Sequence, residues 1–208
     1  METLLRRYTE LPFVIDYLHT EELALLNPAS WDDRNDSFYM EEYARRSGSK
    51  SVYALCLANC AETYHHWRVF SHGSGGACIQ FNPEKFSRAI SQVDGIRSEA
   101  VQYKTIEELK RTNPTLNELP FLKRYAFQNE GERRLFCASK EVGPPIRRIP
   151  MPRSTVDRIV LSPWLHDSVA DRVKKTLKAI PGCSQVKIYR STLVENEHWK
   201  KFANGSTY

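Results

Sequence analysis

The residues best suited to chemistry in this 208-residue sequence lie in polar clusters, the last of which is Glu130-Gly131-Glu132-Arg133-Arg134. It opens an expected strand, in which residues two apart point to the same side, so Glu130, Glu132 and Arg134 would form one polar row. Neighbouring carboxylates repel, which can raise one pKa, and the adjacent arginine opposes this rise. A surface strand could carry the same row for solubility alone.

A second cluster, Trp31-Asp32-Asp33-Arg34-Asn35-Asp36, places three carboxylates within five positions. Such residues cap helices and close turns, and we expect Asp36 to cap a helix over Phe38–Arg46. The functional interpretation is a loop that holds a cation or orients a catalytic neighbour. Its candidate binding residues are Asp33, Arg34, Asn35 and Asp36.

Aromatic and basic residues make up two further stretches, Arg6–Thr9 and Glu62–Phe70. Helical spacing puts Thr63, His66, Trp67 and Phe70 on one face and Tyr64, His65 and Arg68 on another. We expect Trp67 and Phe70 to be core residues. The adjacent histidines point about 100° apart on a helix and cannot both bind one metal, so at most one of them acts as an acid or base.

Composition favours a globular protein with ordinary solvated faces, and its basic excess leaves an anionic partner open as an alternative. Thirty basic and 25 acidic residues give a net charge of +5, with basic doublets such as Arg133-Arg134 and Lys123-Arg124 along the chain. Dispersed doublets usually cover solvated faces, whereas doublets gathered on one side would bind phosphates, nucleic acid included.

Nothing in the sequence indicates export, a membrane or a metal. No apolar run precedes the first charges, and none approaches the ~20 residues of a membrane span. The five cysteines are scattered and odd in number, which predicts reduced thiols and a cytoplasmic protein. Cys56 and Cys60 have no second Cys/His pair at ligand spacing, so we expect no metal site.

The pattern of apolar residues predicts one α+β domain over 1–208, with a mixed, mainly antiparallel sheet and peripheral helices. It consists of a core at 1–138, a Pro-rich loop at 139–153 that could act as a lid, and C-terminal strands and a helix at 154–208. Neither a G-x-G-x-x-G nor a phosphate-loop signature occurs. Expected strands are Leu4–Tyr8, 23–26, 52–57, 77–81, 96–103, 132–138, 159–161 and 186–189; expected helices begin near Pro12, 38, 62, 83, 106, 119 and 167.

In this order the clusters resemble a known family. Leu5–Thr9 followed by Leu23–Asp36 is similar to the opening of the bacterial domain-of-unknown-function family 2971. Members continue with a tryptophan helix, a Gly-x-Cys-Ile-x-Phe strand and an E-x-E-x-R strand, here Trp67, Gly76–Phe81 and Glu130–Arg134. The resemblance covers roughly residues 4–138.

The layout is also similar to ADP-ribosyltransferase-like domains, which implies NAD as a substrate. The resemblance places Arg7, with Tyr8 or Thr9, at the first catalytic position and Glu132 at the last, with Glu130 beside it. No Ser-Thr-Ser occupies the second position, where Tyr53 or Tyr64 would stand in. It implies that Arg7 holds the pyrophosphate, assisted by Arg34 or Arg124, while a carboxylate stabilises the positive ribose.

The leading hypothesis is therefore an ADP-ribosyltransferase-like enzyme with an unknown macromolecular acceptor, nucleic acid or protein. Such an enzyme could be a toxin or phage-defence effector with a cognate antitoxin or defence-system partner. One alternative is a metal-dependent nuclease or phosphodiesterase, with Asp32, Asp33, Asp36 and Glu132 around a divalent ion. The other is a non-catalytic module that binds nucleic acid or protein, in which Glu130 and Arg134 form a structural ion pair.

Overall fold

The computed structural model describes residues 4–203, which form two compact units. Unit 1 comprises the residues up to Arg7, Glu21–Cys60 and Phe81–Thr155. Unit 2 comprises Tyr8–Thr20, Ala61–Gln80 and the residues from Val156 onward. The expectation of a single domain over 1–208 stays a prediction.

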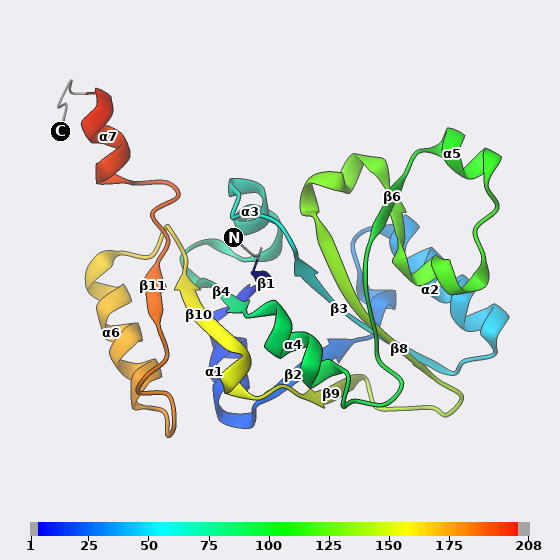
Figure 1. Ribbon diagram of the computed structural model, residues 1–208, viewed down its shortest axis with the longest axis horizontal. Coiled ribbons are helices and arrows are strands. Elements are labelled where there is room, and N and C mark those ends of the chain that lie inside the picture. The colour runs from blue at the N-terminus through cyan, green and yellow to red at the C-terminus, as the bar shows by residue number, and fades with distance from the viewer. Residues whose placement is uncertain (1–3, 204–208) are drawn as a thin grey trace. The chain divides into compact units, whose positions relative to one another are not determined.

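Strands and helices alternate irregularly along the chain (Figure 1). The strands are β1 (Leu5–Glu10), β2 (Glu22–Leu26), β3 (Ser51–Ala58), β4 (Gly76–Phe81), β5 (Arg97–Ala100), β6 (Gln102–Lys104), β7 (Leu122–Arg124), β8 (Glu132–Ser139), β9 (Ile146–Pro150), β10 (Val156–Leu161) and β11 (Ile188–Arg190). The α-helices are α1 (Leu11–Thr20), α2 (Arg34–Ser47), α3 (Tyr64–Phe70), α4 (Pro83–Ile90), α5 (Ile106–Arg111), α6 (Asp167–Ala179) and α7 (Glu197–Ala203).

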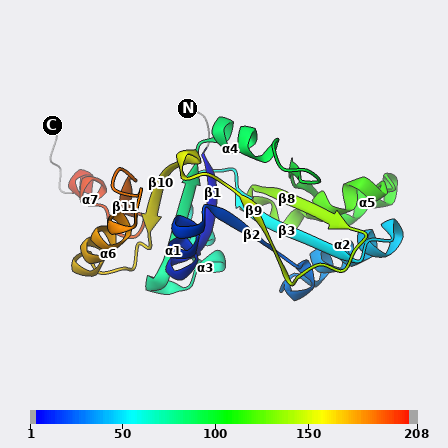
Figure 2. The ribbon, with the colours of Figure 1, turned by 90° about the horizontal axis from the view of Figure 1, so that it is seen from below.

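Unit 1 is built on the antiparallel pair β3–β8, whose register runs from Ser51 opposite Ser139 to Ala58 opposite Glu132. β2 also pairs with β3, β9 with β2 and β5 with β8, all antiparallel. Figure 2 shows β2, β3 and β8 running side by side. In unit 2, β10 and β11 are parallel. The fold is thus α+β with mixed, mainly antiparallel pairing, and this confirms the predicted fold class.

Helix α2 begins earlier than the sequence suggested, because Asp33 and not Asp36 is its cap. Asp33 Oδ1 accepts hydrogen bonds from the backbone N–H groups of Asn35, at 3.0 Å, and Asp36, at 3.4 Å. The helix ends at Ser47, and the φ of 66° at the following Gly48 places this cap residue in the left-handed region that favours glycine. The prediction of Asp36 as the cap was wrong, and its carboxylate is available for another role.

Three other expected elements differ from the structure. The helix expected to begin near 119 is replaced by a 3-10 turn at Leu116–Phe121, strand β7 and a 3-10 turn at Tyr125–Glu130, since Pro120 cannot donate a helical hydrogen bond. The strand expected over 96–103 is divided into β5 and β6. The loop expected at 139–153 contains β9, because residues 146–150 pair with β2.

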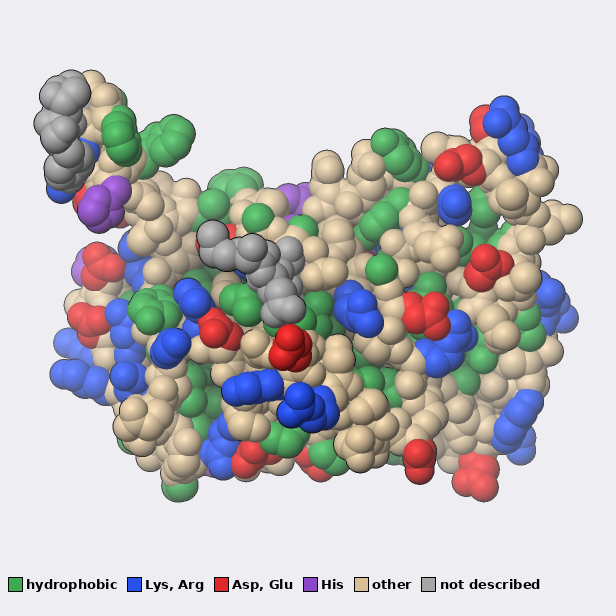
Figure 3. Space-filling model, viewed as in Figure 1, with side chains coloured by type: hydrophobic (Ala, Val, Ile, Leu, Met, Phe, Trp, Pro, Cys, Tyr) green, Lys and Arg blue, Asp and Glu red, His purple; other side chains and the backbone are tan. Residues whose placement is uncertain are grey.

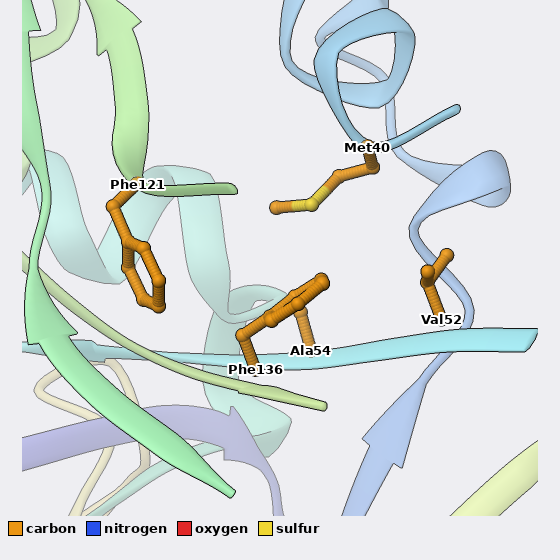
Figure 4. Packing of buried hydrophobic residues seen from close by; sticks show 5 residues of the cluster. All are labelled: Met40, Val52, Ala54, Phe121 and Phe136. Carbon is orange, nitrogen blue, oxygen red and sulfur yellow. The ribbon is translucent and has the colours of Figure 1, made fainter. Parts of the chain in front are cut away.

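A hydrophobic cluster beneath α2 holds this helix on the β3–β8 pair of unit 1. Figure 4 shows Met40 of α2 pointing toward Ala54 and Phe136, with Phe121 and Val52 on either side. All five side chains are buried. The cluster therefore fixes the helix whose first turn carries Asp36.

Charged side chains of both signs are dispersed over the face of the molecule shown in Figure 3. On this face, lysines and arginines are mixed with aspartates and glutamates, as on an ordinary solvated surface. Across residues 4–203, no helix combines the length and the apolar character that a membrane crossing requires.

Met40→Ala should destabilise the protein by about 2–5 kcal/mol, because it leaves a cavity in a closely packed cluster. Phe38→Ala, which changes an exposed side chain of the same helix, is the matched control. Phe38 is 58% exposed and Met40 1% exposed, so the control should change stability much less. Urea unfolding followed by circular dichroism measures both, and equal losses would contradict this account of the core.

Candidate functional site

The candidate site of unit 1 is centred on Arg134, whose side chain is fully buried. Its Nη1 and Nη2 donate to the two carboxylate oxygens of Asp36 at 2.8 and 2.7 Å, and its Nε donates to Glu132 Oε1 at 2.6 Å. Nη1 also donates to the carbonyl oxygen of Pro120 at 2.8 Å. Glu132 and Arg134 therefore share one face of β8, as the sequence predicted.

Lys123 joins the second predicted glutamate to this network. Its Nζ lies 2.5 Å from Glu130 Oε2, 3.4 Å from Glu132 Oε2 and 3.7 Å from Asp36 Oδ2. Glu130 ends a 3-10 turn instead of lying in β8, and Gly131, with φ of 51°, reverses the chain between the two glutamates. The tip of the Glu130 side chain thus reaches the row from a neighbouring segment.

Opposite charges keep Glu132 ionised although it is buried. Burial alone would raise the pKa of Glu132, but the charge and hydrogen bond of Arg134, together with the charge of Lys123, lower it to about 2. For Asp36, the effect of burial is larger than that of the charge and hydrogen bonds of Arg134, so the pKa of Asp36 is raised. Glu132 is consequently the more firmly ionised of the two carboxylates on Arg134.

Two aromatic side chains support the network. The Arg134 guanidinium lies over the Trp31 ring, 4.9 Å from its centroid, a cation–π contact that suits a desolvated arginine. The Tyr103 hydroxyl accepts a hydrogen bond from the Glu132 backbone N–H at 2.8 Å. Burial raises the pKa of Tyr103 well above its ordinary value, so the hydroxyl stays neutral.

A pocket of about 370 Å³ adjoins the network within unit 1. Asp36 and Lys123 belong both to the network and to the pocket wall. The remaining wall residues combine cationic, aromatic and aliphatic side chains: Arg34, Asn35, Phe38, Tyr39, Lys104, Ile106, Leu109, Leu122 and Arg124. This wall suits an anionic ligand that also carries flat or apolar groups.

The structure gathers part of the predicted site in unit 1. Arg34, Asn35, Asp36 and Arg124 line the pocket, while Glu130, Glu132 and Arg134 form the network beside it. Asp33 caps α2. The sequence analysis did not identify Lys123 and Lys104 as site residues. Lys123 could have been noticed as part of the Lys123-Arg124 doublet, and Lys104 as the lysine that ends β6.

The other predicted residues fall in unit 2 or in β1. Tyr8 is buried and stacks on His66, with centroids 5.2 Å apart, and meets Trp67 edge-on. His66 and Trp67 are buried too, which confirms Trp67 as a core residue. Tyr64 is exposed, and Thr9 is half-buried in β1. Their predicted binding roles stay predictions.

Arg7 lies in β1 of unit 1, and its Nη1 donates to the carbonyl oxygen of Cys56 at 3.3 Å. Its neighbour Arg6 is opposite Ala58, and Ala58 is opposite Glu132. Directly opposed residues in a sheet point to the same face and successive residues to opposite faces, so the ladder aligns Glu132 with Arg6 instead of Arg7. The role of Arg7 in binding pyrophosphate stays a prediction.

Three of the four carboxylates named by the nuclease hypothesis have other partners. Asp33 caps α2, and Asp36 and Glu132 both bind Arg134. Among residues 4–203, no group of three or more His, Cys, Asp or Glu side chains is placed to hold a metal ion. All five cysteines are reduced thiols.

No protein-family model and no curated protein matches this sequence, so the resemblance to family 2971 stays a prediction. Three solved structures of DarT from Thermus sp. 2.9 are similar at 10% sequence identity. They are its complexes with carba-NAD+ (TM-score 0.45), NAD+ (0.46) and ADP-ribosylated ssDNA (0.47). The first two matches cover 91% of this chain and 96% of DarT, and the third covers 91% and 94%. A likeness this distant assigns neither a fold nor an activity to the chain.

The lowered pKa of Glu132 predicts how much this side chain stabilises the protein at each pH. Its contribution should be complete above pH 4.5, the ordinary pKa of a glutamate, and disappear as the pH falls toward 2. The full effect is on the order of 3 kcal/mol, since one pKa unit corresponds to about 1.4 kcal/mol. Urea unfolding of wild type and Glu132→Gln across this range measures it. A difference that does not shrink in acid would contradict the assignment.

Gly131→Ala should destabilise the protein more than Gly95→Ala does. Both glycines have positive φ, 51° and 75°, so each substitution brings the strain of a left-handed alanine, about 1–2 kcal/mol. Only at Gly131 would the new Cβ also meet Cys60, at 3.0 Å. Thermal unfolding of both variants tests this ranking. Equal decreases in melting temperature would contradict it, since they would mean that the Cys60 side chain moves away from the new Cβ at no cost.

Proposed function

We propose that this chain is an ADP-ribosyltransferase-like enzyme that binds NAD in the unit 1 pocket. The observation that carries the proposal is the pocket wall, where cations and aromatic rings adjoin a buried, ionised carboxylate. NAD combines the same features in one molecule, since it carries two phosphates and two flat rings. The acceptor, and a role as a toxin or phage-defence effector with a cognate antitoxin, belong to the same proposal.

The cations supply the first step, which is binding of the pyrophosphate. Arg34, Lys104 and Arg124 each line the pocket. Arginine and lysine form charge-assisted hydrogen bonds with phosphate oxygens, and each such bond contributes about 1.5–3 kcal/mol. Tyr39 and Phe38, also in the wall, offer rings for contact with the adenine or nicotinamide.

Glu132 supplies the second step, which is stabilisation of the ribose as the nicotinamide leaves. Breaking that bond places positive charge on the ribose, and an ionised carboxylate lowers the energy of this state. In the structure, Lys123 contacts Glu130 more closely than Glu132, at 2.5 against 3.4 Å. In our proposal the bound phosphates attract the Lys123 ammonium, which leaves Glu132 but keeps its closer contact with Glu130. Glu132 Oε2 then faces the ribose.

One observation favours a second candidate, the non-catalytic module. Both carboxylate oxygens of Glu132 already lie near cations, Oε1 at Arg134 and Oε2 at Lys123. A carboxylate held in this way can be purely structural. In that case the chain binds nucleic acid or protein and does not cleave NAD, so turnover distinguishes the two candidates.

Wild-type protein should bind NAD and release nicotinamide in the presence of cell extract. Arg124→Ala and Lys104→Ala should each weaken NAD binding about tenfold or more, measured by calorimetry, since each removes a cation from the wall. Glu132→Gln should bind NAD but release nicotinamide at least about a hundredfold more slowly.

Glu99→Gln is the matched control, because Glu99 also pairs with an arginine in unit 1, at 2.9 Å, but is exposed and lies outside the pocket wall. It should bind and react as the wild type does. Folded wild type that releases no nicotinamide, whether or not it binds NAD, would contradict the enzyme and favour the non-catalytic module.

A further inference from the structure

An arginine–aromatic stack lies on the surface of unit 2. The Arg68 guanidinium is 4.2 Å from the centroid of a Trp164 ring and 5.1 Å from that of Tyr64. Arg68 Nε donates to the Tyr64 hydroxyl at 2.8 Å, and the Tyr64 and Trp164 rings meet edge-on. Arg68 and Tyr64 are exposed, and Trp164 is half-buried. A planar cation is therefore held against two rings at the surface.

Each member of the stack is fixed by its own element. Tyr64 and Arg68 are one turn apart on α3, whose cap Thr63 accepts from the His66 backbone N–H at 3.2 Å. Trp164 follows β10, and its backbone N–H donates to Ser162 Oγ at 3.1 Å. A ligand therefore meets side chains that are already ordered, which lowers the entropy lost on binding.

The charge of Arg68 is not neutralised within the described part of the chain. Across residues 4–203, no carboxylate lies within 4.0 Å of its guanidinium nitrogens. The acids near the Trp164 turn pair with another arginine: Asp167 and Glu195 lie 3.3 and 3.8 Å from Arg190. Arg68 thus presents both a positive charge and a planar surface.

We propose that this stack is a binding site for a base of single-stranded nucleic acid. Unpaired bases stack on aromatic rings and on guanidinium planes, and the charge of Arg68 attracts the adjoining phosphate. Duplex bases are already stacked on each other and cannot enter such a site. The inference goes beyond the proposed function, because this binding needs neither NAD nor the unit 1 pocket.

The test is fluorescence anisotropy of a short labelled oligodeoxythymidine with the full chain, without NAD. Trp164→Leu and Arg68→Gln should each weaken binding about tenfold or more, the loss expected when one stacked base loses its support. Arg68→Lys keeps the charge but removes the planar group, so it too should weaken binding. Circular dichroism and thermal unfolding establish that each variant is folded.

Two controls separate stacking from general attraction. Trp199→Leu removes an exposed tryptophan of α7 and Arg172→Gln an exposed arginine of α6, and both should bind within about twofold of wild type. The proposal is overturned if wild type fails to bind the oligonucleotide or if Arg68→Lys binds as tightly as wild type. It is also overturned if the controls lose as much affinity as the stack variants, or if Arg68→Gln impairs only capture of a protein partner.

Discussion

The arrangement of unit 1 depends on the buried guanidinium of Arg134. A buried charge is tolerated only when partners satisfy it, because the loss of its hydration is otherwise uncompensated. Here Asp36 of α2, Glu132 of β8 and the Pro120 carbonyl all accept from the same side chain. The guanidinium therefore positions a helix, a strand and the segment that leads into β7, while the Met40 cluster provides the apolar packing around them.

The same charges determine the chemistry that the adjoining pocket can support. Asp36 and Lys123 take part in the network and also line the pocket. A ligand that changes the position of either side chain in the pocket therefore also changes the network. The network keeps Glu132 ionised, as stabilisation of a positive ribose requires, and it also occupies both oxygens of that side chain. In the proposed reaction the ammonium of Lys123, the network cation that also lines the pocket, moves away from Glu132. One oxygen of Glu132 is then available to the ribose.

Local patterns in the sequence predicted much of the fold and less of the site. The apolar run 52–57 indicated β3, the helix expected to begin at 167 is α6, and the spacing of Glu132 and Arg134 placed both on one face. Lys123 was missed because the turns around β7 that bring it to Glu130 and Glu132, and its approach to the distant Asp36, leave no regular spacing in the sequence. The true cap of α2 was missed because Asp33 and Asp36 are equally suitable by residue type, and only the distant Arg134 distinguishes them.

A double-mutant cycle between Asp36 and Arg134 tests most directly whether their ion pair organises unit 1. The unfolding free energies of wild type, Asp36→Asn, Arg134→Gln and the double variant would be measured in urea at neutral pH. Loss of one partner from a buried pair costs about 3–5 kcal/mol, so the second substitution should add little, and a coupling of about 2 kcal/mol or more is expected. Strictly additive effects, within about 0.5 kcal/mol, would contradict the account.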